Sequence, residues 1–225
     1  MGANIELRAS DGHQFGGYRA EPEGSPRGAV VVLQEIFGVN SHMREVCDRF
    51  ADQGYVALAP ALFDRHQRNF QSGYAPEEVK RAREFLGVVD WDAMMRDVEA
   101  AVDSVRAVGP VAVVGFCLGG SLAFLAATRI DGVVAAIGYY GGKIAAHAEE
   151  VPHCPTQLHF GAEDQGIPLS DVDLVAAKRP DCEVHIYEGA GHGFNCDQRS
   201  SYHPEAAREA WNRTTSWLDR HINAG

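Results

Sequence analysis

Cys117, Asp164 and His192 are three residues whose types and order along the chain could perform nucleophilic catalysis. Cys117 lies in the segment Gly115-Phe-Cys-Leu-Gly119, directly after an apolar run. The pattern Gly-x-nucleophile-x-Gly is typical of a nucleophile elbow, a sharp strand-to-helix turn whose backbones approach too closely for a Cβ. At the N-terminus of a helix the dipole and the unpaired N–H groups favour a thiolate. The segment therefore indicates a cysteine nucleophile.

The same pattern also fits a buried cysteine in an ordinary strand-to-helix turn, since free cysteine is among the most buried residue types. An acid and a histidine that follow the nucleophile in this order favour catalysis over that alternative. Asp164 follows one apolar run, and His192 stands between two glycines after the next. Glu163 is the alternative acid; Asp164 is preferred because it precedes the turn Gln-Gly-Ile-Pro. The carboxyl ends of parallel strands share one sheet edge, so we expect these side chains to meet there.

His192 is chosen as the base because it alone of the ten histidines has a glycine on each side. His159 and His185 lie inside strand patterns and are predicted to be core or sheet-face residues. Seven histidines lie in polar stretches and are predicted at the surface: His13, His42, His66, His147, His153, His203 and His221.

Four motifs spread along the chain are together typical of one protein family. They are Gln34-Glu-Ile-Phe-Gly38, Gly-Tyr-x-Ala-x-x-Pro over 54–60, Gly115-Phe-Cys-Leu-Gly-Gly120 and Gly191-His-Gly-Phe194. With them the chain resembles the dienelactone hydrolase (carboxymethylenebutenolidase) family of α/β-hydrolases. The resemblance implies that Cys117 is the nucleophile, Asp164 the acid and His192 the base. It also implies that Glu35 is an extra active-site carboxylate, which interacts with the resting cysteine and helps to remove its proton when substrate binds.

Glu35 follows the apolar run 29–33, so it is expected at the same sheet edge as Cys117; a surface acid in a loop is the alternative. A resting thiol kept neutral would resist oxidation and alkylation, because the thiolate is the reactive form. The oxyanion hole is expected to use the backbone N–H of Leu118, directly after the nucleophile, and that of Ile36. None of this requires a metal or a cofactor.

The predicted reaction is acyl transfer in two steps. Cys117 attacks an ester or lactone carbonyl to form a thioester, and water activated by His192 then hydrolyses it. Esters and lactones suit a thiolate better than amides do, because the amine is a poorer leaving group, so an esterase is favoured over a peptidase. An acyl-thioesterase or a general carboxylesterase of the same fold is the alternative activity. A ligand-binding scaffold without catalysis is the alternative from another class.

Four residues are assigned to substrate binding: Phe37, Arg81, Tyr139 and Arg199. Arg81 belongs to the basic segment Lys80-Arg-Ala-Arg83, which could hold a carboxylate or form a solvated helix face. The resemblance also implies an arginine that holds a substrate carboxylate, shortly after His192 in the sequence. Counted from His192, that position holds Cys196, and Arg199 lies three residues further on. Tyr139 could equally well pack in the core.

Nucleotide binding is disfavoured by the spacing of the glycines. A dinucleotide fingerprint needs Gly-x-Gly-x-x-Gly, and Cys117 occupies the position of its second glycine. The segment 138–143 has the wrong spacing for a P-loop and an isoleucine after its lysine.

Length and composition predict one domain over residues 1–225, with 45% hydrophobic and 23% charged residues. The N-terminal residues lack the pattern of a signal peptide, and no apolar run approaches the ~20 residues of a membrane span. Five irregularly spaced cysteines form neither a zinc pattern nor a disulfide framework, so a reducing cytoplasm is expected. The net charge of −11 disfavours nucleic acid and anionic membranes as partners. A small-molecule substrate and a monomer or small homo-oligomer are expected.

Apolar runs alternate with helix-like stretches, which predicts an α/β fold with a mostly parallel sheet flanked by helices on both faces. The expected strands lie near 29–33, 55–59, 111–114, 133–138, 156–160 and 183–187. The expected helices lie near 41–52, 77–87, 91–107, 120–129, 170–178 and 205–222. Two short apolar segments that flank Asp11-Gly12 predict a hairpin before the parallel part.

Overall fold

A computed structural model describes residues 2–222. The backbone clusters into two compact units, Met1–Val111 and Ala112–Gly225. Each unit contains four of the eight strands found among the described residues, and the boundary falls inside strand β5 (Val111–Phe116).

The first unit begins with the predicted hairpin. Strands β1 (Ala3–Arg8) and β2 (Gln14–Ala20) are antiparallel, and Gly12 takes a φ of +88° in the turn between them. Strand β2 also pairs antiparallel with β4 (Val56–Pro60), which pairs parallel with β3 (Ala29–Leu33). The order in this unit is therefore β1-β2-β4-β3. Every residue of β3 and β4 is buried, as expected for strands covered on both faces.

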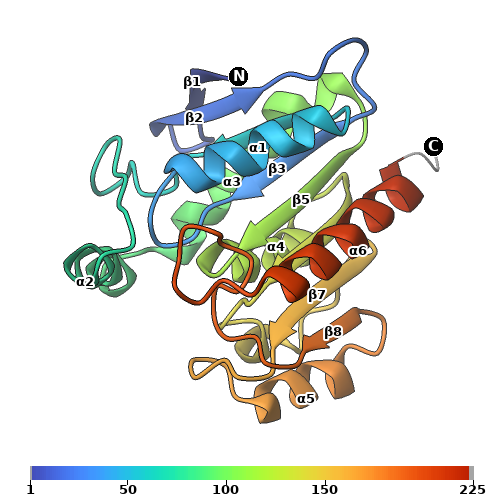
Figure 1. Cartoon of the computed structure of the whole chain (residues 1–225). Coiled ribbons are helices and arrows are strands. Elements are labelled where there is room, and N and C mark those ends of the chain that lie inside the picture. Colours follow the sequence, from blue (N-terminus) through green and yellow to red (C-terminus); the bar gives the residue numbers. More distant parts are fainter. Residues whose placement is uncertain (1, 223–225) are drawn as a thin grey trace. The chain divides into compact units, whose positions relative to one another are not determined.

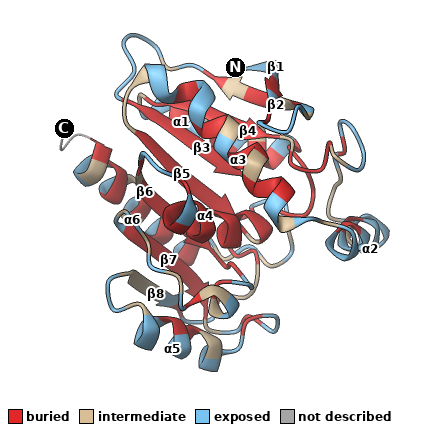
Figure 2. Cartoon of the chain, turned by 180° about the vertical axis from the view of Figure 1, so that it is seen from behind, coloured by how far each residue is buried: buried red, intermediate tan, exposed pale blue. Residues whose placement is uncertain are grey.

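Helices cover the two faces of the first unit's strands. In Figure 1 α1 (Ser41–Asp52) lies in front of them, and Figure 2 shows α3 (Trp91–Val105) on the opposite face. Asn40 and Asp90 cap these helices, each accepting a hydrogen bond from the N–H three residues on. Helix α2 (Pro76–Glu84) begins with a proline and buries only Ala82. Two 3₁₀ turns span Phe85–Gly87 and Arg106–Val108.

The second unit has the strand order β5-β6-β7-β8. Strands β6 (Val133–Tyr139), β7 (Thr156–Gly161) and β8 (Glu183–Tyr187) are parallel neighbours. Helices α4 (Leu118–Arg129) and α6 (Pro204–Ile222) cover opposite faces of this unit, as Figures 1 and 2 show. Helix α5 (Leu169–Lys178) connects β7 to β8, and a 3₁₀ turn spans Ala145–His147.

The predicted elements agree with the structure to within a few residues, and the largest differences have local causes. Helix α4 begins at Leu118 rather than near 120, because Gly119 and Gly120 are helical and not part of the turn. A Cβ at Gly120 would overlap the carbonyl oxygen of Tyr139, so the glycine lets the helix lie directly on β6. The prediction of His42 at the surface is wrong: it is 3% exposed, on the same helical face as Val46 and Phe50. None of the described helices combines the length and hydropathy needed to cross a membrane.

Candidate active site

Cys117 stands at the junction of β5 and α4 in a strained conformation. It is the N-cap residue of α4 and has a φ of +56° and a ψ of −111°. Its N–H donates to the carbonyl oxygen of Tyr139 at 3.0 Å, which ties the turn to β6. A Cβ at Gly115 would overlap the carbonyl oxygen of Gly119, so the glycine before the turn is required by close backbone contact. Positive φ in a residue with a side chain costs about 1–3 kcal/mol, and such strain clusters at functional sites.

The imidazole of His192 lies between the sulfur and a carboxylate. His192 Nε2 is 3.1 Å from Cys117 Sγ, and His192 Nδ1 is 2.7 Å from Asp164 Oδ2. The second oxygen of Asp164 accepts a hydrogen bond from the Gly166 N–H at 2.8 Å, which fixes the carboxylate plane. Glu163 is exposed, so Asp164 is the acid that contacts the ring. This arrangement can orient an imidazole and exchange a proton with a thiol.

The loops that carry the acid and the base are joined by backbone hydrogen bonds. The N–H of Ala162 donates to the carbonyl of Tyr187, and that of Glu163 donates to the carbonyl of Ala190, both at 2.9 Å. These bonds extend the pairing of β7 and β8 beyond the strands. The relative positions of Asp164 and His192 are therefore set by backbone as well as by their own contact.

The electrostatic surroundings of His192 favour its protonated form. Burial alone would lower the pKa of His192, but the charge on the Cys117 sulfur and the hydrogen bond to Asp164 outweigh it and raise the pKa to about 10. The ring therefore keeps its proton at neutral pH when the sulfur carries a charge. A protonated imidazole in contact with a sulfur nucleophile is an acid placed to act on a departing group.

Aromatic side chains pack around the imidazole. The ring of Tyr140 lies 5.1 Å from that of His192, and Phe194 packs edge-on against Tyr140 at 5.4 Å. Tyr140 is buried and has a φ of +38°, with its N–H donating to the carbonyl of His159 at 2.7 Å. The contact between Tyr140 and the imidazole depends on the direction of a strained backbone, which no sequence motif specifies.

Tyr139 is fully buried, and its hydroxyl shares a 2.6 Å hydrogen bond with Thr214 Oγ1. Its ring lies against Phe116 and His159. This burial favours the core role that the sequence left open beside substrate binding. His159 is fully buried and His185 half-buried, so the prediction of core or sheet-face positions for both is confirmed.

Arg199 is half-buried and its guanidinium lies over Gly193, directly after His192. A Cβ at Gly193 would meet the end of the flexible Arg199 side chain, which can move, whereas the φ of +77° at Gly193 itself favours glycine. Leu118 is the first residue of α4, so its N–H has no acceptor within the helix.

The remaining predicted site residues belong to the first unit. Glu35, Ile36 and Phe37 follow β3 and are only 1%, 7% and 2% exposed. Arg81 lies on the exposed α2, where its guanidinium donates to Gln67 Oε1 at 3.2 Å and lies 5.8 Å from the ring centre of Phe70. The guanidinium of Arg81 therefore borders the segment 67–70. Glu35 is buried, so the alternative of a surface acid is wrong.

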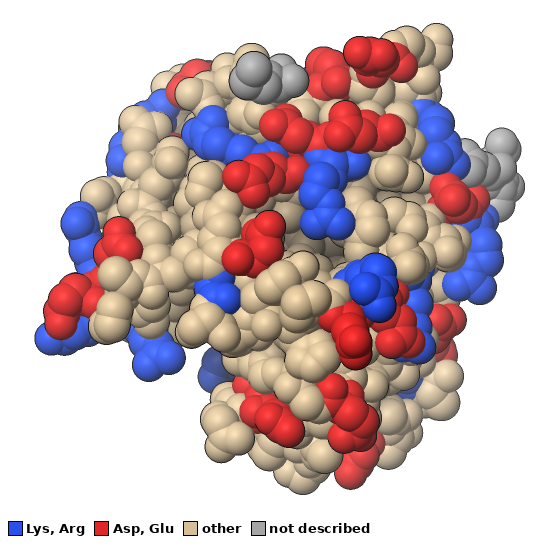
Figure 3. Space-filling model, in the orientation of Figure 1, with Lys and Arg blue, Asp and Glu red and all other residues tan. Residues whose placement is uncertain are grey.

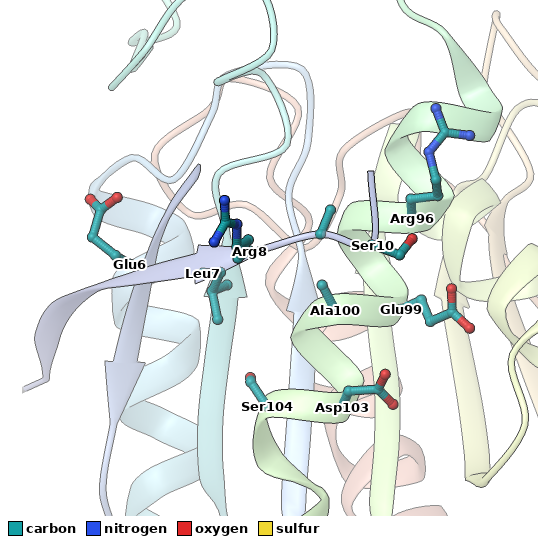
Figure 4. A pocket seen from close by; sticks show the side chains of 10 residues that line it. Glu6, Leu7, Arg8, Ser10, Arg96, Glu99, Ala100, Asp103 and Ser104 are labelled. Carbon is teal, nitrogen blue, oxygen red and sulfur yellow. The ribbon is translucent and has the colours of Figure 1, made fainter. Parts of the chain in front are cut away.

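Figure 4 shows a surface pocket of about 640 Å³ in the first unit, between β1 and α3. Arg8 and Arg96 line it together with Glu6, Glu99 and Asp103. Basic and acidic side chains are mixed here, as they are over the face drawn in Figure 3. This pocket contains none of the predicted site residues, and its mixture of basic and acidic side chains indicates no particular class of ligand.

Comparison with known proteins agrees with the motifs and the geometry. The model of the dienelactone hydrolase family matches residues 15–222. A carboxymethylenebutenolidase of Pseudomonas putida is 35% identical over 226 residues, which cover 95% of this chain and 94% of that protein. A Synechocystis protein, provisionally given the same name, is 36% identical over 220 residues, 89% of each chain.

A solved structure of a Klebsiella pneumoniae protein classed by name as a dienelactone hydrolase superposes with a TM-score of 0.83 at 27% identity. The match covers 98% of this chain and 99% of that one. The predicted fold class is confirmed: mostly parallel strands with helices on both faces form an α/β-hydrolase fold. The chain is a hydrolase acting on esters or lactones, and it belongs to the dienelactone hydrolase family.

Proposed function

We propose that this hydrolase cleaves carboxylic ester or lactone bonds with Cys117 as nucleophile, His192 as acid and base, and Asp164 as the acid that orients the imidazole. The observation that supports this most directly is the placement of the His192 ring, with one nitrogen 3.1 Å from the sulfur and the other 2.7 Å from the carboxylate. The strained turn at Cys117 and the raised pKa of His192 point the same way.

In the first step the Cys117 thiolate attacks the carbonyl carbon, and the carbonyl oxygen becomes negative. The Leu118 N–H at the start of α4 is one proposed donor to this oxygen, and the Ile36 N–H is the other, which the sequence motif supports. His192 gives its proton to the departing oxygen, the C–O bond breaks, and a thioester remains on Cys117. Opening a lactone leaves the alcohol attached to the acyl group.

The second step uses the same groups, but His192 now accepts a proton instead of donating one. Acylation removes the negative charge from sulfur, so the cause that raises the pKa of His192 most strongly is lost. The ring, held by Asp164, then accepts a proton from water as water attacks the thioester. The tetrahedral intermediate collapses, the C–S bond breaks, and the acid product leaves with the thiolate restored.

Glu35 is proposed to gate the nucleophile, as a buried carboxylate that keeps the resting thiol neutral. Phe37, Arg81 and Arg199 remain proposed substrate-binding residues. The gate is tested by the rate at which iodoacetamide alkylates Cys117 across a pH range. Faster alkylation below pH 8 in Glu35→Gln than in wild type supports the gate, and identical profiles remove it.

Hydrolysis of 4-nitrophenyl acetate, followed by acid quenching and mass spectrometry, tests the main proposal. Wild type should release nitrophenol and carry the added mass of an acetyl group on Cys117. Cys117→Ala should lose both signals, while Cys117→Ser keeps the shape of the side chain and should retain slow turnover. Turnover by Cys117→Ala at the wild-type rate would exclude the mechanism, and no turnover by wild type on a panel of esters, lactones and acyl-thioesters would favour a ligand-binding scaffold.

The setting is proposed to be cytoplasmic, with a small-molecule substrate, no nucleic-acid or membrane partner, and a monomer or small homo-oligomer. All five cysteines are free thiols, which supports a reducing compartment. The net charge of −11 supports the absence of phosphate-bearing partners. Light scattering coupled to size exclusion gives the oligomeric state.

A further inference from the structure

A second pocket of the first unit, with a volume of about 350 Å³, lies beside the hairpin of β1 and β2. Across the hairpin Gly16 pairs with Glu6, and Gly17 pairs with Ile5. Neither glycine carries a side chain, so open space remains beside the two strands. The start of α1 and the loop after β4 also border this space. Its volume falls in the range of pockets that hold small-molecule ligands.

Arg44 of α1 contributes a positive charge to this pocket. Its guanidinium donates to the Val39 carbonyl at 3.2 Å and to Asn4 Oδ1 at 2.9 Å. It also lies over the ring of Tyr18, 4.7 Å from the ring centre. Among residues 2–222, no carboxylate lies within ion-pair distance of Arg44. Two of the five guanidinium N–H groups therefore bond to neutral acceptors, and the other three remain available to a bound anion.

The loop after β4 adds the side-chain amides of Asn69 and Gln71 to the pocket. Within the described part of the chain, neither amide has a hydrogen-bond partner. Their backbone is held in place, since the Asn69 N–H donates to Asp64 Oδ1 at 2.7 Å. Gln71 forms a β-bridge with Gly38, and the other oxygen of Asp64 accepts from the Gly16 N–H at 2.8 Å. Both amides are therefore positioned to bond to a hydroxyl or carbonyl group of a ligand.

The charges around the pocket favour a ligand with one negative charge. Glu6 is the acid among the described residues that line it, and it pairs with Arg68 at 2.5 Å. The charge of Arg44 is thus the unpaired one among the lining side chains. A single guanidinium matches a carboxylate through two parallel N–H···O bonds. A phosphate monoester carries close to two negative charges and would find no second unpaired guanidinium among the lining residues.

We propose that this pocket binds a small hydroxy acid, whose carboxylate bonds to Arg44 and whose hydroxyl group bonds to the amides of Asn69 and Gln71. The buried side chains of Val39 and Phe70 give the hydrocarbon part of the ligand an apolar surface. The lining residues lie between positions 4 and 71, within the first unit, and none of them takes part in the proposed function. Binding here is therefore independent of that function.

Three probes with the same number of carbon atoms test which groups of the ligand are recognised. Lactate carries a carboxylate and a hydroxyl group, propionate lacks the hydroxyl group, and propane-1,2-diol lacks the carboxylate. Nuclear magnetic resonance follows the Nε–H signal of Arg44 and the side-chain amide signals of Asn69 and Gln71. These signals belong to pocket residues, so they report binding in this pocket rather than at the triad.

Lactate should shift all three signals to saturation with a Kd of about 1–10 mM. Propionate should bind about threefold more weakly, because it offers the amides no hydroxyl group. The diol should bind about tenfold more weakly than lactate, because it offers Arg44 no carboxylate. Inorganic phosphate should also bind more weakly than lactate, because its second charge finds no partner.

Two variants and a matched control link the binding to the proposed contacts. Arg44→Gln removes the charge and should raise the Kd for lactate about tenfold or more. Asn69→Gly removes one amide at a φ of +55°, which glycine adopts without strain, and should raise the Kd about threefold. Arg19→Gln removes an arginine of the same unit that pairs with Glu21 and does not line the pocket, so the Kd should stay within about twofold.

Each result supports or overturns the assignment of the pocket. Unchanged affinity for lactate in folded Arg44→Gln overturns it, as do equal affinities for lactate and the diol. Tighter binding of phosphate than of lactate overturns the choice of a carboxylate, and signals that do not shift below about 100 mM lactate exclude the binding site. If Arg44→Gln does not fold, Asn69→Gly and the three probes still decide the question, because they need no change at Arg44.

Discussion

Gly161 and Ala190 bring the backbones of two loops into direct contact. Gly161 is the last residue of β7, and a Cβ on it would overlap the carbonyl oxygen of Ala190 and crowd that of Gly191. The first loop leads to Asp164 and the second to His192, so this close approach is part of what holds the acid 2.7 Å from the imidazole. The glycine is required here by space rather than by backbone conformation.

Gly161→Ala should therefore force the two loops apart and lower activity together with stability. We expect kcat/KM to fall at least tenfold and the free energy of unfolding to fall by about 1–3 kcal/mol, the usual cost of overpacking. Ester hydrolysis and urea denaturation measure the two effects. Gly142→Ala is the matched control, because its nearest neighbour would lie at an ordinary 3.7 Å. Full activity in Gly161→Ala would show that the loops tolerate separation.

Asp164→Asn should lower kcat/KM about 10²- to 10⁴-fold, because an amide cannot stabilise the imidazolium and can hold the wrong tautomer. Glu163→Gln should leave it nearly unchanged, since Glu163 is exposed and His192 bonds to Asp164. Steady-state kinetics on the two variants separates the neighbouring acids. A larger loss in Glu163→Gln than in Asp164→Asn would reverse their roles.

Much of this arrangement could be predicted from local sequence. Continuous apolar runs predict buried parallel strands, and residues just after such runs must lie at strand ends, which is why Asp164 and His192 could be chosen. The turn at Cys117 can be recognised from a local motif, because the glycines that must lack a Cβ lie close to Cys117 in the sequence.

Other contacts depend on pairing that the sequence does not specify. The side-chain oxygen of Gln34 accepts a hydrogen bond from the Leu62 N–H only because β3 and β4 are neighbours, and no residue spacing indicates which strands pair. Arg199 reaches Gly193 through the turn after His192, and Tyr140 turns toward the imidazole through a positive φ. His42 was misplaced because its polar neighbours in sequence conceal a buried helical face.

The imidazole of His192 should titrate near pH 10, and its pKa should fall in Cys117→Ala, where the anionic sulfur is absent. Nuclear magnetic resonance of the ring nitrogens measures both values, with the other histidines as internal references. The folded-state pKa lies above the usual 6.5, so this group's stabilisation is present below about pH 6.5 and lost as the pH rises through about 10. An unchanged pKa of His192 in Cys117→Ala would show that the sulfur does not raise the pKa of the imidazole.

Residues 1–225 are proposed to unfold as one domain, although the backbone clusters into two units. Domain boundaries normally fall in exposed linkers, whereas this boundary lies between Val111 and Ala112 inside β5. Calorimetry should therefore show one transition whose calorimetric and van't Hoff enthalpies agree. Two separated transitions would identify the units as independent domains.

Acid should destabilise the protein through His159, which is fully buried and uses both ring nitrogens, in hydrogen bonds to Tyr187 and Gln157. Burial lowers the pKa of His159 well below its usual value, and the charges of His185 and Arg213 lower it further. The unfolded chain thus binds a proton that the folded chain resists, so stability is full above about pH 6.5 and falls as the pH drops below it.

His159→Gln removes this group while keeping a polar side chain. Urea denaturation at pH 7.5 and pH 5 should show a smaller loss of unfolding free energy between the two values in the variant than in wild type. His185 shifts in the same direction and keeps part of the slope in both proteins, so the comparison isolates residue 159. Equal slopes would mean that His159 is protonated in the folded state at pH 5 without cost, which its two hydrogen-bonded nitrogens and complete burial argue against.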